Sequence, residues 1–229
     1  MGQARPQRIW MTRMSRRSKQ LDAACQQGER LHAAGRLAEA EQMYRQVLAA
    51  EPRHADASHM LGVLALQSGH PAAALDLFDA AILVKPLVSA YHVHRAHALL
   101  ALRRPAEAVV ACRVALRTKS NNAEAYQVLG HAHTDALQPG EALRAYREAV
   151  RLKPNLPDLF NNLGTALRNI GALEEAEERL REALRRAPDD MGGANQSIER
   201  AEGAGQGRGC RVAVARGTWP AAEGPGAAL

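Results

Sequence analysis

This sequence of 229 residues has few of the features that mark membrane, secreted or metal-binding proteins. No stretch long enough for a transmembrane helix is without charged residues. The three cysteines, Cys25, Cys112 and Cys210, show no paired spacing, which argues against a disulfide framework or a zinc site. A reducing, cytoplasmic setting fits this cysteine usage best. Arginine greatly outnumbers lysine, a bias that suggests a GC-rich, bacterial genome.

Catalytic motifs are also absent from the sequence. It contains no Gly-x-Ser-x-Gly, no phosphate-binding glycine loop, no His-Glu-x-x-His and no dinucleotide fingerprint. The acidic pairs Glu174-Glu175 and Glu177-Glu178 alternate with arginines at helical spacing, which is typical of a salt-bridged, solvated helix surface. We therefore expect a protein that is not an enzyme and that binds no cofactor.

What the sequence does contain is a repeat of 34 residues. Proline recurs at this period, with Ser120 in the one missing place, at Pro52, Pro86, Pro154 and Pro188. A fixed period of this length marks a chain built from stacked copies of one structural unit. Such an array has no interior cleft of the enzyme type, but it offers a long surface for holding partners.

The period divides the chain into five repeats, which span residues 21–54, 55–88, 89–122, 123–156 and 157–190. The eighth position of each repeat is small: Gly28, Gly62, Ala96, Gly130 and Gly164. The twentieth is always alanine, and the twenty-fourth is mostly large: Tyr44, Phe78, Cys112, Tyr146 and Leu180. Two helices can cross closely only where side chains are small, and the larger residue fills the space beside the crossing.

Helical periodicity supports the same division. In residues 139–153 the apolar positions trace one helix face. Pro71, Pro105 and Pro139 stand where second helices would begin, and a missing N–H is tolerated there. We expect helices near 22–34, 37–50, 55–68, 71–84, 89–102, 105–118, 123–136, 139–152, 157–170 and 173–186.

This pattern resembles the tetratricopeptide repeat, a helix–turn–helix unit of 34 residues, over residues 21–190. The resemblance implies an all-α, right-handed superhelical solenoid of antiparallel helix pairs. The third repeat departs most from the family pattern, with Arg95-Ala96 in place of Leu-Gly, Arg103 in the turn and Ser120 in place of proline. We expect its boundary with the fourth repeat to be looser or shifted.

In this family the first helix of each repeat lines a concave groove. The resemblance implies a non-catalytic scaffold or adaptor that binds a peptide or protein segment there. The candidate groove residues are His59, Val63, His94, His97, Gln127, His131, Asn161, Asn162 and Thr165. The same register also places Cys25, Asp56, Met60, Val93 and Val128 on this face.

The groove residues do not match two ligand-binding patterns known in the family. They lack the set of Lys, Asn and Arg with which some family members bind acidic chaperone tails. Of the asparagine ladder that other members use, only Asn162 is present. Four groove histidines raise the hypothesis that mild acidification makes the groove cationic, so that an acidic peptide binds more tightly near about pH 5.5 than 7.5. We expect no metal site, because no cysteine or carboxylate completes a ligand set around His94 and His97.

The two ends differ from the repeats. Residues 1–20 carry six basic and no acidic side chains, whereas the repeats are nearly neutral, so we expect no specific nucleic-acid binding. We expect residues 1–20 to be a disordered basic arm and residues 191–229, rich in Gly and Ala, to be mostly disordered apart from a short helix near 194–202.

Three alternatives stay open. The 191–229 tail is either natural or the product of a slipped reading frame near codon 190, because the repeat pattern stops abruptly there. Similar arrays often precede glycosyltransferase or sulfotransferase domains, so the chain could be the substrate-recruiting module of such an enzyme. A terminal repeat could also mediate self-association.

Overall fold

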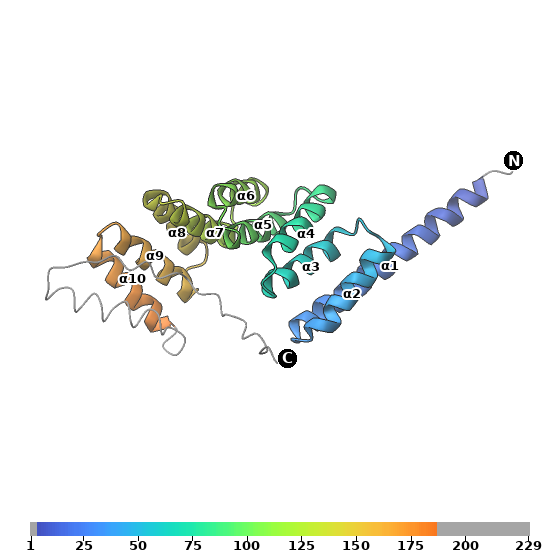
Figure 1. Cartoon of the computed structure of the whole chain (residues 1–229), viewed down its shortest axis with the longest axis horizontal. Coiled ribbons are helices and arrows are strands. Elements are labelled where there is room, and N and C mark those ends of the chain that lie inside the picture. The colour runs from blue at the N-terminus through green and yellow to red at the C-terminus, as the bar shows by residue number, and fades with distance from the viewer. Residues whose placement is uncertain (1–3, 187–229) are drawn as a thin grey trace, which may run out of the picture. The chain divides into compact units, whose positions relative to one another are not determined.

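The computed structural model describes residues 4–186, with side-chain placement from residue 17 onward, and this part of the chain is built of helices without strands (Figure 1). The helices in chain order are α1 (Ala4–Ala33), α2 (Leu37–Ala50), α3 (Ala55–Gln67), α4 (Pro71–Val84), α5 (Ser89–Ala101), α6 (Pro105–Thr118), α7 (Ala123–Asp135), α8 (Pro139–Leu152), α9 (Pro157–Asn169) and α10 (Leu173–Arg186). None of these described helices has the length and hydrophobicity to cross a membrane. The predicted tail, with its helix near 194–202, lies outside the described residues.

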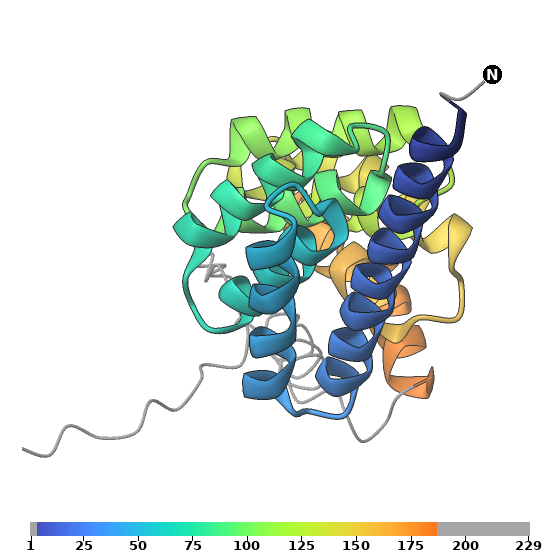
Figure 2. The same cartoon turned by 90° about the vertical axis from the view of Figure 1, so that its right-hand side faces the viewer.

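From α2 onward the helices begin where the sequence predicts and end within one residue of the predicted positions. The first helix differs, because residues 4–20, which we expected to be disordered, form the first part of α1. This segment contains no glycine, and its only proline, Pro6, lies in the first turn, where it leaves helix hydrogen bonds intact. The guanidinium of Arg17 donates a 3.0 Å hydrogen bond to the carbonyl of Ala50, which joins α1 to the end of α2. Figure 2 shows α1 and α2 as a hairpin.

The boundary between the third and fourth repeats keeps the spacing of the others, contrary to the expectation of a shift. The helix α6 ends at Thr118 and α7 begins at Ala123. The side chain of Asn122 accepts a 3.2 Å hydrogen bond from the N–H of Ala125, so it caps α7 at its first turn. Ser120 therefore replaces proline without moving either helix.

Close helix crossings explain the small residue at the eighth position of the repeats. A Cβ atom added to Gly62 would lie 2.7 Å from a ring carbon of Phe78, and one added to Gly164 would lie 2.7 Å from Cγ of Leu180. Both distances are far below van der Waals contact, so any larger side chain would push the two helices of the repeat apart. The large residue at the twenty-fourth position thus packs directly against the glycine of the same repeat.

All five turns between paired helices share one backbone conformation. The fifteenth residue of each repeat has a positive φ: Gly35, Gly69, Arg103, Leu137 and Gly171. In each turn the N–H of this residue and of the next one bond to carbonyls of the last helical turn, which is the Schellman arrangement. Glycine adopts this conformation readily, whereas Arg103 and Leu137 adopt it at an energetic cost.

The chain divides into two compact units, one ending at Ala98 and one beginning at Leu99, and each is described by itself. The core of the N-terminal unit contains a cluster around Cys25, Ala40, Tyr44 and Leu64. The core of the C-terminal unit contains a cluster of Ala142, Leu143, Tyr146, Leu163, Ala166, Leu167 and Ala176. Alanine at the crossings and larger residues beside them fill both cores, as the repeat pattern predicts.

Candidate functional site

The first helices carry the predicted groove residues, and most of these side chains are half-buried. Val63, His94, His97, Gln127, His131, Asn161, Asn162 and Thr165 all fall in this class. His59 is buried, with only 9% of its surface exposed. Cys25, Val93 and Val128, which the same register places on this face, are at most 2% exposed, so they belong to the core and cannot contact a ligand.

In the N-terminal unit, two predicted groove histidines bond to each other. Nε2 of His59 lies 2.9 Å from Nδ1 of His94, and the same Nδ1 lies 3.0 Å from the carbonyl oxygen of Ala90. A carbonyl oxygen can only accept, so a proton on Nδ1 of His94 is shared between the carbonyl of Ala90 and Nε2 of His59. This hydrogen bond joins α3 to α5, and it occupies Nε2 of His59, which is then not available to a peptide.

The His59 ring is also packed among aromatic rings. Its centroid lies 4.6 Å from that of Tyr91, 4.8 Å from that of His94 and 5.8 Å from that of Phe78. Burial, together with the neighbouring His94, lowers the pKa of His59 to about 4. His59 is therefore neutral near pH 5.5, and it must be removed from the set of histidines that we expected to charge the groove on mild acidification.

The carboxylate of Asp56, at the start of α3, is also hydrogen-bonded to side chains of its own unit. Nζ of Lys85 donates a 2.7 Å hydrogen bond to one carboxylate oxygen, and the hydroxyl of Tyr91 donates a short hydrogen bond to the other. Burial opposes ionisation of Asp56, but the hydrogen bonds from Lys85 and Tyr91 outweigh it and lower the pKa of the carboxyl group. This carboxylate joins α3 to the end of α4 and to α5.

The C-terminal unit presents a different arrangement on its first helices. No hydrogen bond within the described part of the chain involves the side chains of Gln127 on α7 or Asn161, Asn162 and Thr165 on α9. Gln127 and Asn162 occupy the fifth and sixth positions of their repeats, as His59 and His94 do. The histidine pair is joined by a hydrogen bond, whereas these two amides are not. The C-terminal unit therefore keeps hydrogen-bonding groups available on this face.

The remaining buried histidines have structural partners. His54 caps α3 by accepting from the N–H of Ala57, and its other ring nitrogen lies 3.2 Å from Asp22. His92 lies 2.8 Å from the carbonyl of Pro86. His133 is 4% exposed and lies 2.7 Å from the side-chain oxygen of Gln138. These histidines hold turns and helix ends.

A spacing rule in the sequence could have revealed the bonded pairs in the N-terminal unit. Hydrogen bonds between first helices of consecutive repeats join residues 35 apart, as in His32 with Gln67, His59 with His94 and Asp56 with Tyr91. A search for complementary side chains at this separation would have placed His59 and Asp56 in such pairs.

Cysteine and metal chemistry find no support in the described residues. Burial raises the pKa of Cys112 to about 12. Burial, followed by the charges of Glu29, Asp56 and Asp22, raises the pKa of Cys25 to the same value. Such thiols stay protonated and make poor nucleophiles. Nowhere in residues 17–186 do three His, Cys, Asp or Glu side chains gather in a way that could hold a metal ion.

Comparison with solved structures places the fold among tetratricopeptide-repeat proteins. TTC0263 from Thermus thermophilus superposes with a TM-score of 0.66 at 20% identity, covering 80% of this chain and 98% of that one. PilF from Pseudomonas aeruginosa gives a TM-score of 0.70 at 17% identity, and the match covers 82% of this chain and 89% of PilF. YrrB, described as a tetratricopeptide-repeat protein with an unusual peptide-binding site, superposes with a TM-score of 0.61 at 22% sequence identity. The match covers 77% of this chain and 90% of YrrB.

Sequence comparison agrees with this fold. No curated protein sequence matches the chain. Two tetratricopeptide-repeat family models do match, one over residues 31–100 and one over residues 128–190. The first segment covers α2 to α4 with parts of α1 and α5, and the second covers α8 to α10 with part of α7. The chain therefore belongs to the tetratricopeptide-repeat family, whose members serve as protein-interaction scaffolds.

Proposed function

We propose that this chain is a non-catalytic adaptor that holds an extended peptide or protein segment against the first helices of its repeats. The observation that carries the proposal is the state of Gln127, Asn161 and Asn162, whose half-buried amides have no hydrogen-bond partner among the described residues. Half-buried amides of this kind bond to water in the free protein, and an extended peptide, which offers one N–H and one C=O per residue, can take the place of that water. A side-chain amide can donate to the peptide carbonyl and accept from the N–H.

In the N-terminal unit the first helices offer a ligand apolar contacts rather than hydrogen bonds. His59, His94 and Asp56 already bond within the unit and fix α3 against α5. The half-buried Val63 and Met60 lie on α3 beside these groups and offer apolar contact for a ligand side chain. A rigid apolar surface of this kind favours a ligand with apolar side chains.

The proposal is tested by selecting ligands on the full chain. Random peptides of about twelve residues, displayed on phage, are selected on the immobilised protein, and an enriched peptide is titrated by calorimetry. The triple variant Gln127→Ala/Asn161→Ala/Asn162→Ala should bind it at least about tenfold more weakly, because each lost hydrogen bond contributes about 1 kcal/mol.

A matched control keeps the test specific. Gln42→Ala/Gln46→Ala removes two amides from the exposed surface of α2 and should leave the affinity unchanged. Circular dichroism verifies that both variants are folded. Failure to enrich any peptide, or equal affinity for the triple variant and the original chain, would contradict the proposed function.

A further inference from the structure

At two positions of the repeat, α6 differs from the other second helices in the described part of the chain. Its twenty-second and twenty-sixth repeat positions are Val110 and Val114. The other repeats carry polar residues, with one alanine, at these two positions: Gln42 and Gln46, Asp76 and Ala80, Arg144 and Glu148, Glu178 and Glu182. Val110 is 59% exposed. Because the other second helices fold with polar residues here, helix packing does not require valine.

Two arginines on the same surface also lack the ion pairs found elsewhere. In α8, Arg144 and Arg151 lie 3.0 and 2.9 Å from glutamates three residues earlier in the helix. Arg113 and Arg117 have no acidic residue three or four positions away in either direction. No ion pair or hydrogen bond of either guanidinium occurs in the described part of the molecule. Their charge is therefore not neutralised within the helix.

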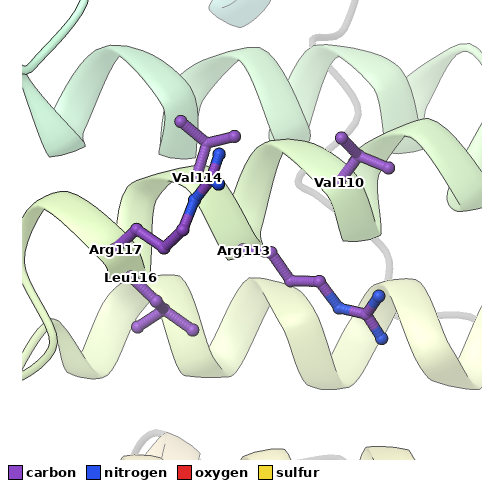
Figure 3. A pocket seen from close by; sticks show the side chains of 5 residues that line it. All are labelled: Val110, Arg113, Val114, Leu116 and Arg117. Atoms are coloured by element: carbon purple, nitrogen blue, oxygen red, sulfur yellow. The ribbon is translucent and has the colours of Figure 1, made fainter.

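These side chains form one surface, which we call the α6 patch: Val110, Arg113, Val114, Leu116 and Arg117. They line an open hollow of about 570 Å³ (Figure 3). Figure 3 shows Val110 and Val114 one turn apart on the same side of α6. The opposite side of α6, with Cys112 and Ala115, is fully buried. The patch thus lies away from the core of the C-terminal unit.

We propose that the α6 patch is a second interaction surface, which docks an amphipathic helix bearing carboxylates. Two valines four residues apart form a ridge that fits between apolar residues spaced at i and i+4 on a partner helix. The planar guanidinium groups pair with carboxylates in a bidentate way and select an acidic partner. This surface belongs to α6, a second helix, and is separate from the first-helix face proposed for the extended peptide.

The direct test uses the full chain and a defined probe. The probe is a fluorescein-labelled helical peptide of about 18 residues with leucines at i, i+4 and i+7 and glutamates flanking them. Fluorescence anisotropy should show binding, and Val110→Arg/Val114→Glu should weaken it at least about tenfold. That variant installs the residues that α8 carries at the same positions, so the fold is expected to tolerate it. The control Gln42→Arg/Gln46→Glu makes the same change on α2 and should bind as the original chain does.

A charge exchange tests the proposed chemistry independently. Arg113→Glu/Arg117→Glu should lose the glutamate probe and gain affinity for a probe in which lysines replace the glutamates. Absence of binding by the original chain up to about 1 mM probe, or equal binding by every variant, would overturn the proposal. The patch could instead bind a second copy of this chain, and sedimentation velocity tests for such dimers. Dimers of the original chain that are absent in Val110→Arg/Val114→Glu would show an interface between copies and would equally overturn the proposal.

Discussion

His59 with His94 in the N-terminal unit and Gln127 with Asn162 in the C-terminal unit are equivalent pairs on the first helices of consecutive repeats. The histidines share a 2.9 Å hydrogen bond and are packed among aromatic rings. The amides, by contrast, have no hydrogen bond in the described part of the chain. The same two repeat positions can therefore fix neighbouring repeats together or leave polar groups for a ligand. Which of these happens depends on the side chains and not on the repeat geometry.

The units differ in their turns as well. Both complete turns of the N-terminal unit have glycine at the positive-φ position, at Gly35 and Gly69. The C-terminal unit has Arg103 and Leu137 in two of its three turns. Non-glycine residues in this conformation cost about 1–2 kcal/mol each. The C-terminal unit therefore carries backbone strain at turns where the N-terminal unit carries none.

The largest effect is expected from overpacking a helix crossing of the C-terminal unit. Ala142 is 1% exposed and belongs to the core cluster that contains Leu143, Tyr146 and Leu167, so Ala142→Trp finds no space. We expect a loss of about 3 kcal/mol or more in the free energy of unfolding, and loss of peptide binding with it. Urea denaturation followed by circular dichroism measures the change. Arg144→Trp, on the exposed side of the same helix, should cost little; equal stability of both variants would show that the repeat register is wrong.

The next largest effect concerns the buried histidine of the N-terminal unit. Its pKa of about 4 when folded lies below the ordinary value of about 6.5 when unfolded, so between these pH values only the unfolded chain takes up the proton. The free energy of unfolding should therefore fall, by on the order of 2–3 kcal/mol, as pH drops from 6.5 to 4. His59→Gln should remove this part of the pH dependence. Parallel stability curves for His59→Gln and the original chain would rule out a depressed pKa.

A matched pair of tyrosines compares the two cores. The hydroxyl of Tyr44, which is fully buried, has no hydrogen-bond partner among the described residues, whereas the hydroxyl of Tyr146 interacts with the side chain of Thr134. Tyr44→Phe should leave stability unchanged or raise it by up to about 1 kcal/mol, and Tyr146→Phe should lower it by about 1 kcal/mol. Phe78 at the equivalent position shows that the repeat accepts phenylalanine. Thermal melting would contradict the comparison if Tyr44→Phe proved the more damaging of the two.

The smallest effect is expected at the turns. Leu137 is 88% exposed, so Leu137→Gly loses no packing and relieves the positive-φ cost, which should raise stability by about 1 kcal/mol or less. The reverse change in the N-terminal unit, Gly69→Leu, should lower stability by a similar amount. Differential scanning calorimetry of both variants measures the pair. A destabilised Leu137→Gly variant would mean that its turn is not strained.

The helix pairs and their order could be predicted from the sequence because each depends on local signals. Prolines at second-helix starts, glycine at the turns and small residues at the crossings place the helix ends to within one residue from α2 onward. The basic composition of residues 4–20 suggests disorder, but nothing in the segment stops a helix, and it forms the first part of α1. The absence of helix-stopping residues, and not the basic composition, therefore decides the conformation of residues 4–20.

The state of the candidate site could be predicted only in part. The repeat register identified the side chains of the first helices, but it also placed Val93 and Val128 on the groove face, and both are buried. Whether His59 offers a nitrogen to a ligand depends on His94, one repeat later, so it follows from contacts between helices and not from position within one repeat. A rule that pairs residues 35 apart points to His59 and His94, but it also points to Gln127 and Asn162, which are not bonded to each other.

We propose that the amides of the C-terminal unit contact a bound segment and that the histidine pair of the N-terminal unit does not. The most direct measurement titrates a selected peptide into isotope-labelled full-length protein and follows side-chain nuclear magnetic resonance signals. We expect the NH₂ signals of Gln127, Asn161 and Asn162 to shift and reach saturation, while the imidazole signals of His59 and His94 stay in place. Shifts confined to the two imidazoles, with the amide signals unmoved, would contradict it.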